Sequence, residues 1–154
     1  MEFTFEDPLP LCINQITDKL FISDENSAAA KKLLEEMKIT HILVVGNYLK
    51  MRFPNDYKYL HLPIDDLPEQ KLNPYFEQAF NFIEEGERVL VHCAAGVSRS
   101  ASMVIAYLMM KNKWSYEIAH DLVKEKRLII NPNSSFVKQL IELEKILEKE
   151  KTEI

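Results

Sequence analysis

Cysteine is scarce in this chain: Cys12 and Cys93 are the only two among 154 residues. Two cysteines without a Cys-x-x-Cys spacing exclude a disulfide framework and the usual cysteine-rich zinc sites. The N-terminal stretch MEFTFEDPLPLC is acidic and contains no apolar segment of the kind that a secretory signal carries. We therefore expect an intracellular protein with reduced thiols, cytoplasmic or also nuclear.

Long apolar runs and an excess of positive charge are missing as well. The longest strongly apolar stretch, residues 101–110, has about half the ~20 residues that a membrane span requires, and Glu2 stands where a myristoylated chain has glycine. The formal net charge is -5, whereas general nucleic-acid binders usually carry a basic surface. We expect neither a membrane nor a nucleic acid as partner, so any anion site must be local. The sequence does not indicate the oligomeric state.

What the sequence does contain is an alternation of strand and helix patterns. Its length and its 47% hydrophobic residues suit a single domain, which we assign to residues 1–154 with a core at about 14–148. Short apolar runs predict strands, and apolar residues at helical spacing predict helices. The expected strands lie at 19–23, 39–45, 59–66 and 88–92, and the expected helices at 24–38, 73–85, from 98 onward, 115–127 and 134–150. This order predicts an α/β fold with a central, mostly parallel sheet flanked by helices on both sides.

The segment RVLVHCAAGVSRSASMVIAYLMM, residues 88–110, joins a predicted strand to a predicted helix through a short loop. A strand-to-helix turn points successive backbone N–H groups and the positive end of the helix dipole at one place, which creates an anion site. The small residues in the loop allow the backbone to wrap closely around such an anion. We predict that the phosphate-binding residues are Ala94, Ala95, Gly96, Val97, Ser98 and Arg99.

Cys93 stands at the start of this loop, where the positive field favours its nucleophilic thiolate form. Six positions later, the planar guanidinium of Arg99 can hold two oxygens of a phosphoryl group. Ser100 can then donate a hydrogen bond to the sulfur when the sulfur must leave. A merely buried cysteine is the alternative, but an arginine and a serine directly after it do not suit an apolar core. We predict that Cys93, Arg99 and Ser100 are catalytic.

The Cys-x5-Arg spacing occurs here together with His92, Gly96, Ser100, the AYLM helix and the NPN turn. With these features the chain resembles the dual-specificity phosphatases of the cysteine-dependent protein tyrosine phosphatase superfamily. The resemblance extends from ITDKLFIS to RLIINPNSSFVKQL and so covers most of the chain. It implies a protein tyrosine phosphatase-like fold. Because only about fifteen residues precede the first expected strand, it also implies a small atypical type without a kinase-docking domain.

The resemblance implies a two-step hydrolysis of phosphotyrosine and phosphoserine or phosphothreonine in proteins, with no metal or other cofactor. Cys93 attacks the phosphorus and forms cysteinyl phosphate, while an aspartic acid protonates the departing oxygen and later activates water. Matching Tyr59 and Ile64 to the family pattern places this acid at Asp66, with its neighbour Asp65 as the alternative.

Five further residues have two interpretations each. Arg127 matches an arginine that receives a second phosphate in some relatives, but a cation at a helix end is also favoured by the helix dipole. His92, at the end of a buried strand, is expected to be structural rather than a proton carrier. Asn131 and Asn133 are expected in turn and cap positions from which they can also brace the loops. Cys12 could pair with Cys93 under oxidation, but the sequence gives no distance between them.

Two competing functions remain open at this stage. The first is a phosphate-reading module that binds without turnover, which the intact Cys93, Arg99 and nearby acid argue against. The second is an enzyme for phosphoinositide, phosphoglycan or RNA phosphates, but residues 94–98 contain no lysine to meet a multiply charged headgroup. We expect a phosphoprotein substrate and a role in signalling. A member of a MAP kinase pathway is one candidate substrate, which the sequence itself does not identify.

Overall fold

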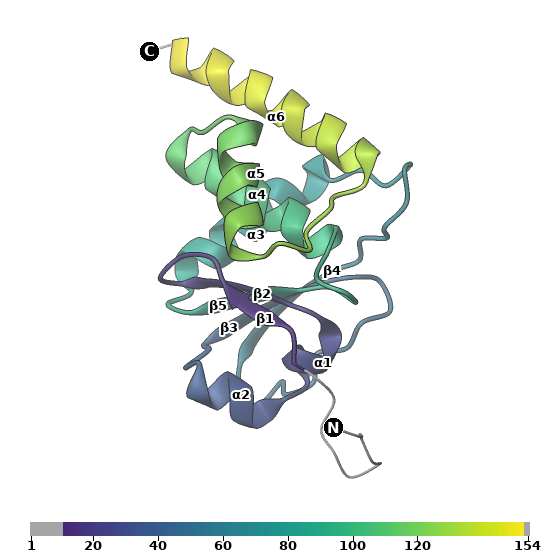
Figure 1. The fold of residues 1–154 in the computed structure, drawn as a ribbon, viewed down its shortest axis with the longest axis vertical. Helices are drawn as coiled ribbons and strands as arrows, with labels where there is room; N and C mark the ends of the chain where they lie inside the picture. The colour runs from purple at the N-terminus through teal and green to yellow at the C-terminus, as the bar shows by residue number, and fades with distance from the viewer. Residues whose placement is uncertain (1–10, 153–154) are drawn as a thin grey trace.

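The computed structural model describes residues 11–152, and the expectation of no leader and no myristoyl anchor falls mostly on residues outside this range. Five strands form one sheet in the order β1-β2-β5-β3-β4 (Figure 1). They are β1 Ile13–Gln15, β2 Leu20–Ser23, β3 His41–Val45, β4 Lys58–Leu62 and β5 Val89–His92. The β2, β5, β3 and β4 strands run parallel, and only β1 is antiparallel to its neighbour. The prediction of a mostly parallel sheet is confirmed.

Helices cover both faces of this sheet, as Figure 1 shows. One face carries the short helices α1 Glu25–Ala28 and α2 Lys31–Glu36, and the other carries α3 Asn73–Glu85, α4 Arg99–Asn112, α5 Tyr116–Lys126 and α6 Ser134–Thr152. Alternate strand residues point to opposite faces. On β5, Val89 and Val91 therefore pack in the large core with α3 to α6, whereas Leu90 packs in the smaller core with α1 and α2. The predicted α/β class with helices on both sides is confirmed.

Two local features differ from the expectations. The helix expected over residues 24–38 is divided into α1 and α2, and Asp24 caps α1 by accepting a hydrogen bond from the Ser27 N–H at 2.9 Å. Strand β1 was not expected, because its three residues show no apolar run. Helix α3 has its expected range of residues 73–85, with Leu72 at its N-cap.

The parallel strands bring three loops to one edge of the sheet. The chain leaves β5 at His92, β3 at Val45 and β4 at Leu62, and all three of these carboxyl ends lie on the same side. In open α/β sheets this is the edge at which ligands bind. No helix within residues 11–152 combines the length and the apolarity needed to cross a bilayer.

Candidate active site

Residues 93–98 form a loop between β5 and α4, and its carbonyl groups all face the surrounding protein. Each backbone carbonyl from Cys93 to Ser98 accepts a hydrogen bond. The donors, in order along the loop, are His92 Nδ1, the Glu25 N–H, Arg127 Nη2, Arg127 Nε, the Asn131 N–H and the Ser102 N–H. Since every carbonyl oxygen is held in this way, the orientation of the loop is fixed along its whole length.

The N–H groups of the same loop behave in the opposite way. Within residues 11–152, the N–H groups of Ala94, Ala95, Val97 and Ser98 donate to no protein acceptor. Gly96, whose φ of 69° lies in the left-handed region, donates its N–H to Cys93 Sγ at 3.3 Å. Successive backbone N–H groups that point toward one place, on the side opposite to the carbonyl groups, form an anion-binding nest. The structure therefore brings together all of the residues expected to bind phosphate, at the start of a long helix.

The Cys93 side chain is almost completely enclosed, with 2% of its surface exposed. Besides the Gly96 N–H, its Sγ lies 3.1 Å from Ser100 Oγ, where either atom can donate. Hydrogen bonds from these two groups stabilise negative charge on sulfur. The predicted pairing of Ser100 with the sulfur is therefore present in the geometry.

Arg99 is the first residue of α4, and its guanidinium reaches toward the ends of two neighbouring strands. Its Nη1 donates to the Ile64 carbonyl at 3.3 Å, which links it to the segment after β4. A Cβ at Gly46, just after β3, would lie only 3.0 Å from Arg99 Nη1 and 2.5 Å from the Leu49 side chain. A side chain at position 46 would therefore displace the Leu49 side chain and crowd the Arg99 guanidinium.

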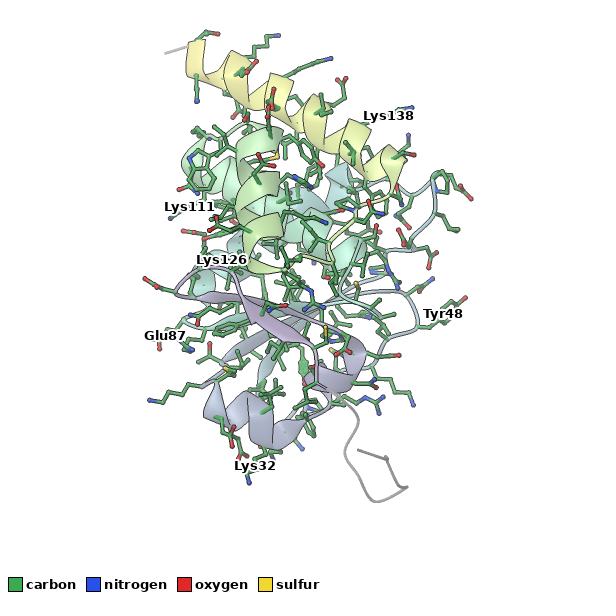
Figure 2. All side chains as sticks on the ribbon, in the orientation of Figure 1. Lys32, Tyr48, Glu87, Lys111, Lys126 and Lys138 are labelled. Carbon is green, nitrogen blue, oxygen red and sulfur yellow. The ribbon has the colours of Figure 1, made fainter. Side chains whose placement is uncertain are left out.

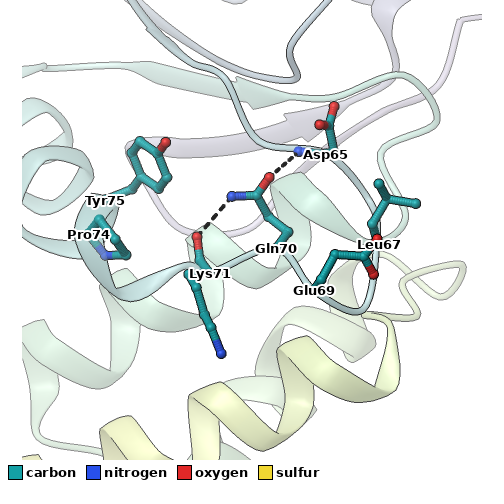
Figure 3. A pocket seen from close by; sticks show the side chains of 7 residues that line it. All are labelled: Asp65, Leu67, Glu69, Gln70, Lys71, Pro74 and Tyr75. Carbon is teal, nitrogen blue, oxygen red and sulfur yellow. Dashed lines mark hydrogen bonds between the residues drawn. The ribbon is translucent and has the colours of Figure 1, made fainter.

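The two candidate acids occupy different surroundings. Asp66 Oδ1 accepts hydrogen bonds from Ser98 Oγ at 2.8 Å and from Asn133 Nδ2 at 2.9 Å, so the carboxylate touches the loop itself. Its Oδ2 has no partner within residues 11–152. Asp65 instead lines a neighbouring hollow, in which its N–H donates to Gln70 Oε1 at 2.9 Å (Figure 3). Only Asp66 is hydrogen-bonded through its carboxylate to the phosphate loop.

The two asparagines of the NPN turn both contact the site. The Asn131 N–H holds the Val97 carbonyl at 2.8 Å. Asn133 caps α6, since its Oδ1 accepts a hydrogen bond from the Phe136 N–H at 2.8 Å. Its Nδ2 donates to Asp66 Oδ1. The expectation that these residues serve a turn and a cap while bracing the loops agrees with this geometry.

His92 is buried beneath the loop, and its Nδ1 lies 3.3 Å from the Cys93 carbonyl. Burial lowers the pKa of His92 to about 4, because a charged imidazolium would lose its hydration there. The ring is therefore neutral near pH 7, where it fits the expected structural role.

The neutral state of His92 predicts a pH dependence of stability. The unfolded chain binds a proton to this residue below about pH 6.5, whereas the folded chain does so only near pH 4. We expect the free energy of unfolding to fall by about 3 kcal/mol as the pH drops through this window. Urea denaturation at several pH values measures the fall, which should be smaller in His92→Asn. The pKa values of His41, Glu84 and Glu85 are also lowered in the folded chain, and these residues are present in both proteins. An equal fall in both proteins would show that such other groups cause it.

The surroundings of Arg127 contradict one of its two interpretations from the sequence. Its side chain is 1% exposed, and its guanidinium donates to the Ala95, Gly96 and Cys12 carbonyls, to Asn14 Oδ1 and to Cys12 Sγ. A side chain enclosed in this way behind the loop cannot receive a second phosphate, so that interpretation is wrong. Arg127 does lie at the C-terminal end of α5, but its partners belong to other segments.

We expect Arg127→Met to lower the free energy of unfolding by about 2–4 kcal/mol, because several buried carbonyls lose their donor at once. Arg127→Lys should retain part of the stability, since one ammonium can replace only some of the five bonds. The exposed neighbour provides the control: Lys126→Met should unfold at nearly the wild-type urea concentration. A similar effect of the two methionine substitutions would refute the bracing role.

No pattern in the sequence indicated that Cys12 and Asn14 would contact Arg127. Cys12 Sγ lies 3.2 Å from Arg127 Nη2, and both cysteines of the chain are free thiols in this structure. A single asparagine in a three-residue strand carries no pattern that could have identified it. In the part of the chain that the structure describes, no three His, Cys, Asp or Glu side chains gather where they could hold a metal ion.

Comparison with known proteins agrees with the site. The family profile "Dual specificity phosphatase, catalytic domain" matches residues 20–146. A probable dual specificity protein phosphatase from Dictyostelium discoideum is 47% identical over 125 residues, which are 79% of this chain and 32% of that protein. A MAP kinase phosphatase with leucine-rich repeats from the same organism is 43% identical over 137 residues, 87% of this chain and 16% of that protein.

A crystal structure of human DUSP28 superposes with a TM-score of 0.84 at 27% identity, covering 92% of this chain and 98% of that one. The curated relatives are longer. The chain spans only 16% to 32% of the length of the first four of them.

Proposed function

The chain belongs to the dual specificity phosphatase family, and we propose that it hydrolyses phosphotyrosine and phosphoserine or phosphothreonine in proteins through a cysteinyl-phosphate intermediate. One observation carries this proposal. The loop around Cys93 has all of its carbonyl groups bonded to the protein behind it, while four N–H groups have no acceptor within residues 11–152. Such a loop binds an anion directly above a nucleophile.

In the first step, the phosphoryl oxygens accept hydrogen bonds from the free N–H groups and from the Arg99 guanidinium. The Cys93 thiolate attacks phosphorus, so that a P–S bond forms while the P–O bond to the substrate breaks. Asp66 Oδ2 donates its proton to the departing oxygen, and Oδ1 stays hydrogen-bonded to Ser98 and Asn133. The dephosphorylated hydroxyl side chain is the first product.

In the second step, a water molecule attacks the phosphocysteine. Asp66, now a carboxylate, takes a proton from this water as the new P–O bond forms and the P–S bond breaks. Ser100 Oγ, which lies 3.1 Å from Cys93 Sγ, donates a hydrogen bond to the leaving thiolate. Inorganic phosphate is released, and the protons and charges return to their starting positions.

Phosphate release from an activated aryl phosphate and from phosphotyrosine and phosphothreonine peptides tests this function. We expect turnover of all three and inhibition by vanadate, which resembles the transferring phosphoryl group. If the protein binds the phosphopeptides but releases no phosphate from any of them, it is a phosphate-reading module. That result would reject the enzymatic proposal.

We also propose that the substrate is a phosphoprotein of a signalling route such as a MAP kinase pathway. The names of the two Dictyostelium relatives with leucine-rich repeats support this. The two free thiols support an intracellular location, in the cytoplasm or also the nucleus. We assign the catalytic core to residues 14–148, which include the segment that the family profile matches.

A further inference from the structure

Large apolar side chains are exposed around the phosphate loop. Nine large hydrophobic residues are exposed within residues 11–152, and five of them lie in three loops that touch the phosphate loop or Arg99. These five are Tyr48 at 90%, Met51 at 46%, Leu67 at 48%, Leu128 at 75% and Ile129 at 50% exposed. We refer to these five residues as the apolar rim. Exposed apolar groups gathered at one place mark an interaction surface.

Each of the three loops that carry the apolar rim has a residue close to the phosphate loop or to Arg99. Leu67 follows Asp66, whose carboxylate is bonded to Ser98. Ile129 precedes Asn131 by two residues, and the Asn131 N–H is bonded to the Val97 carbonyl. Tyr48 projects from the body of the molecule (Figure 2). It comes two residues after Gly46, where an added Cβ would lie 3.0 Å from Arg99 Nη1.

The rim also continues into a concave surface. Leu67 lines a hollow of about 350 Å³ together with Pro74 and Tyr75 from the start of α3 (Figure 3). The other lining side chains are polar or charged: Asp65, Glu69, Gln70 and Lys71. The main chain of this segment is held by α6, since Gln139 accepts from the Leu72 N–H at 2.8 Å and donates to the Gln70 carbonyl at 2.9 Å. The wall of the hollow at residues 70–72 is therefore held in place.

We infer that the apolar rim binds the residues next to the phosphoresidue of the substrate, and that it selects phosphoprotein segments with large apolar side chains there. The inference rests on the proposed function, because it takes the phosphate to lie in the Cys93 loop. An extended chain covers ~3.3–3.6 Å per residue, so the two residues on either side of a bound phosphoresidue stay within about 7 Å of it. Residues within this reach can contact the loops that carry Leu67, Leu128 and Ile129, since Asp66 and Asn131 of these loops are bonded to the phosphate loop.

A binding measurement that needs no turnover tests this inference. Cys93→Ser protein is titrated with two phosphotyrosine peptides of equal length and charge, one flanked by leucine and phenylalanine and the other by serine and glutamine. We expect the apolar peptide to bind on the order of tenfold more tightly, because it buries apolar side chains against the rim. The same apolar peptide without phosphate should bind far more weakly than its phosphorylated form.

Matched substitutions separate the rim from exposed apolar residues elsewhere. In the Cys93→Ser background, Leu128→Ser combined with Ile129→Ser, and separately Leu67→Ser, should reduce the tenfold ratio to a few-fold or less. Ile118→Ser on α5 and Ile146→Ser on α6 replace residues that are 54% and 56% exposed and should keep the ratio.

The inference is overturned if the two peptides bind equally, or if the helix substitutions reduce the ratio as much as the rim substitutions. It is also overturned if the rim substitutions leave the ratio intact but abolish binding to phosphatidylcholine–phosphatidylserine vesicles, which would identify a membrane surface. A protein without turnover that still shows the ratio would reject the proposed enzyme and keep the inference.

Discussion

Cys93→Ser is expected to bind phosphopeptide but to lose turnover by on the order of 10⁴-fold or more. A serine fits this enclosed position, where the side chain is 2% exposed and lies beside Ser100 Oγ and the Gly96 N–H. Both neighbours stabilise a sulfur anion, but neither can remove a proton from a hydroxyl group. The variant therefore keeps the anion site and lacks a nucleophile.

Steady-state phosphate release and peptide binding, measured on the same preparation, check this result. Cys12→Ser is the matched control. It should stay within a few-fold of wild type, because a serine oxygen can also accept the hydrogen bond that Arg127 Nη2 donates to Cys12 Sγ. If Cys93→Ser hydrolysed phosphopeptides at a rate near wild type, the nucleophile would have to be another residue.

The sequence could predict this part of the site because the chemistry is local. Cys93, Arg99 and Ser100 lie within eight consecutive residues of a single strand–loop–helix unit. Apolar periodicity on both sides of the loop sets the course of the backbone, and the loop geometry then places the three side chains together. The same logic predicted the parallel sheet, because buried parallel strands appear as nearly continuous apolar runs.

Arg127 shows where such reasoning fails. Its partners lie 31 residues away at Gly96 and 115 residues away at Cys12, and no local pattern records contacts of that range. From the sequence alone, a cation at the end of a helix looks exposed. Only the contacts of its side chain with the back of the phosphate loop and with Asn14 of β1 show that it is buried. The break between α1 and α2 is a smaller case, since the intervening alanines favour a helix by propensity.

The choice between Asp65 and Asp66 came from resemblance and not from local pattern, because two adjacent acids have the same chemistry. The structure separates their surroundings. The Asp66 carboxylate is held by Ser98 and Asn133 at the phosphate loop, whereas Asp65 lines the hollow beside Gln70. These contacts support Asp66 as the general acid, and kinetics on different leaving groups can test that assignment.

Asp66→Asn is expected to reduce turnover of a tyrosyl or alkyl phosphate by on the order of 10²–10⁴-fold, because a poor leaving group needs a proton as it departs. On an activated aryl phosphate, whose leaving group needs little protonation, the loss should be much smaller. The variant should also lose the fall in rate at alkaline pH, which arises when the acid is already deprotonated. Asp65→Asn, as the matched control, should change the rates only modestly on either substrate. If Asp65→Asn instead shows the large loss that depends on the leaving group, the general acid is Asp65, and the bonds from Ser98 and Asn133 to Asp66 only support the loop.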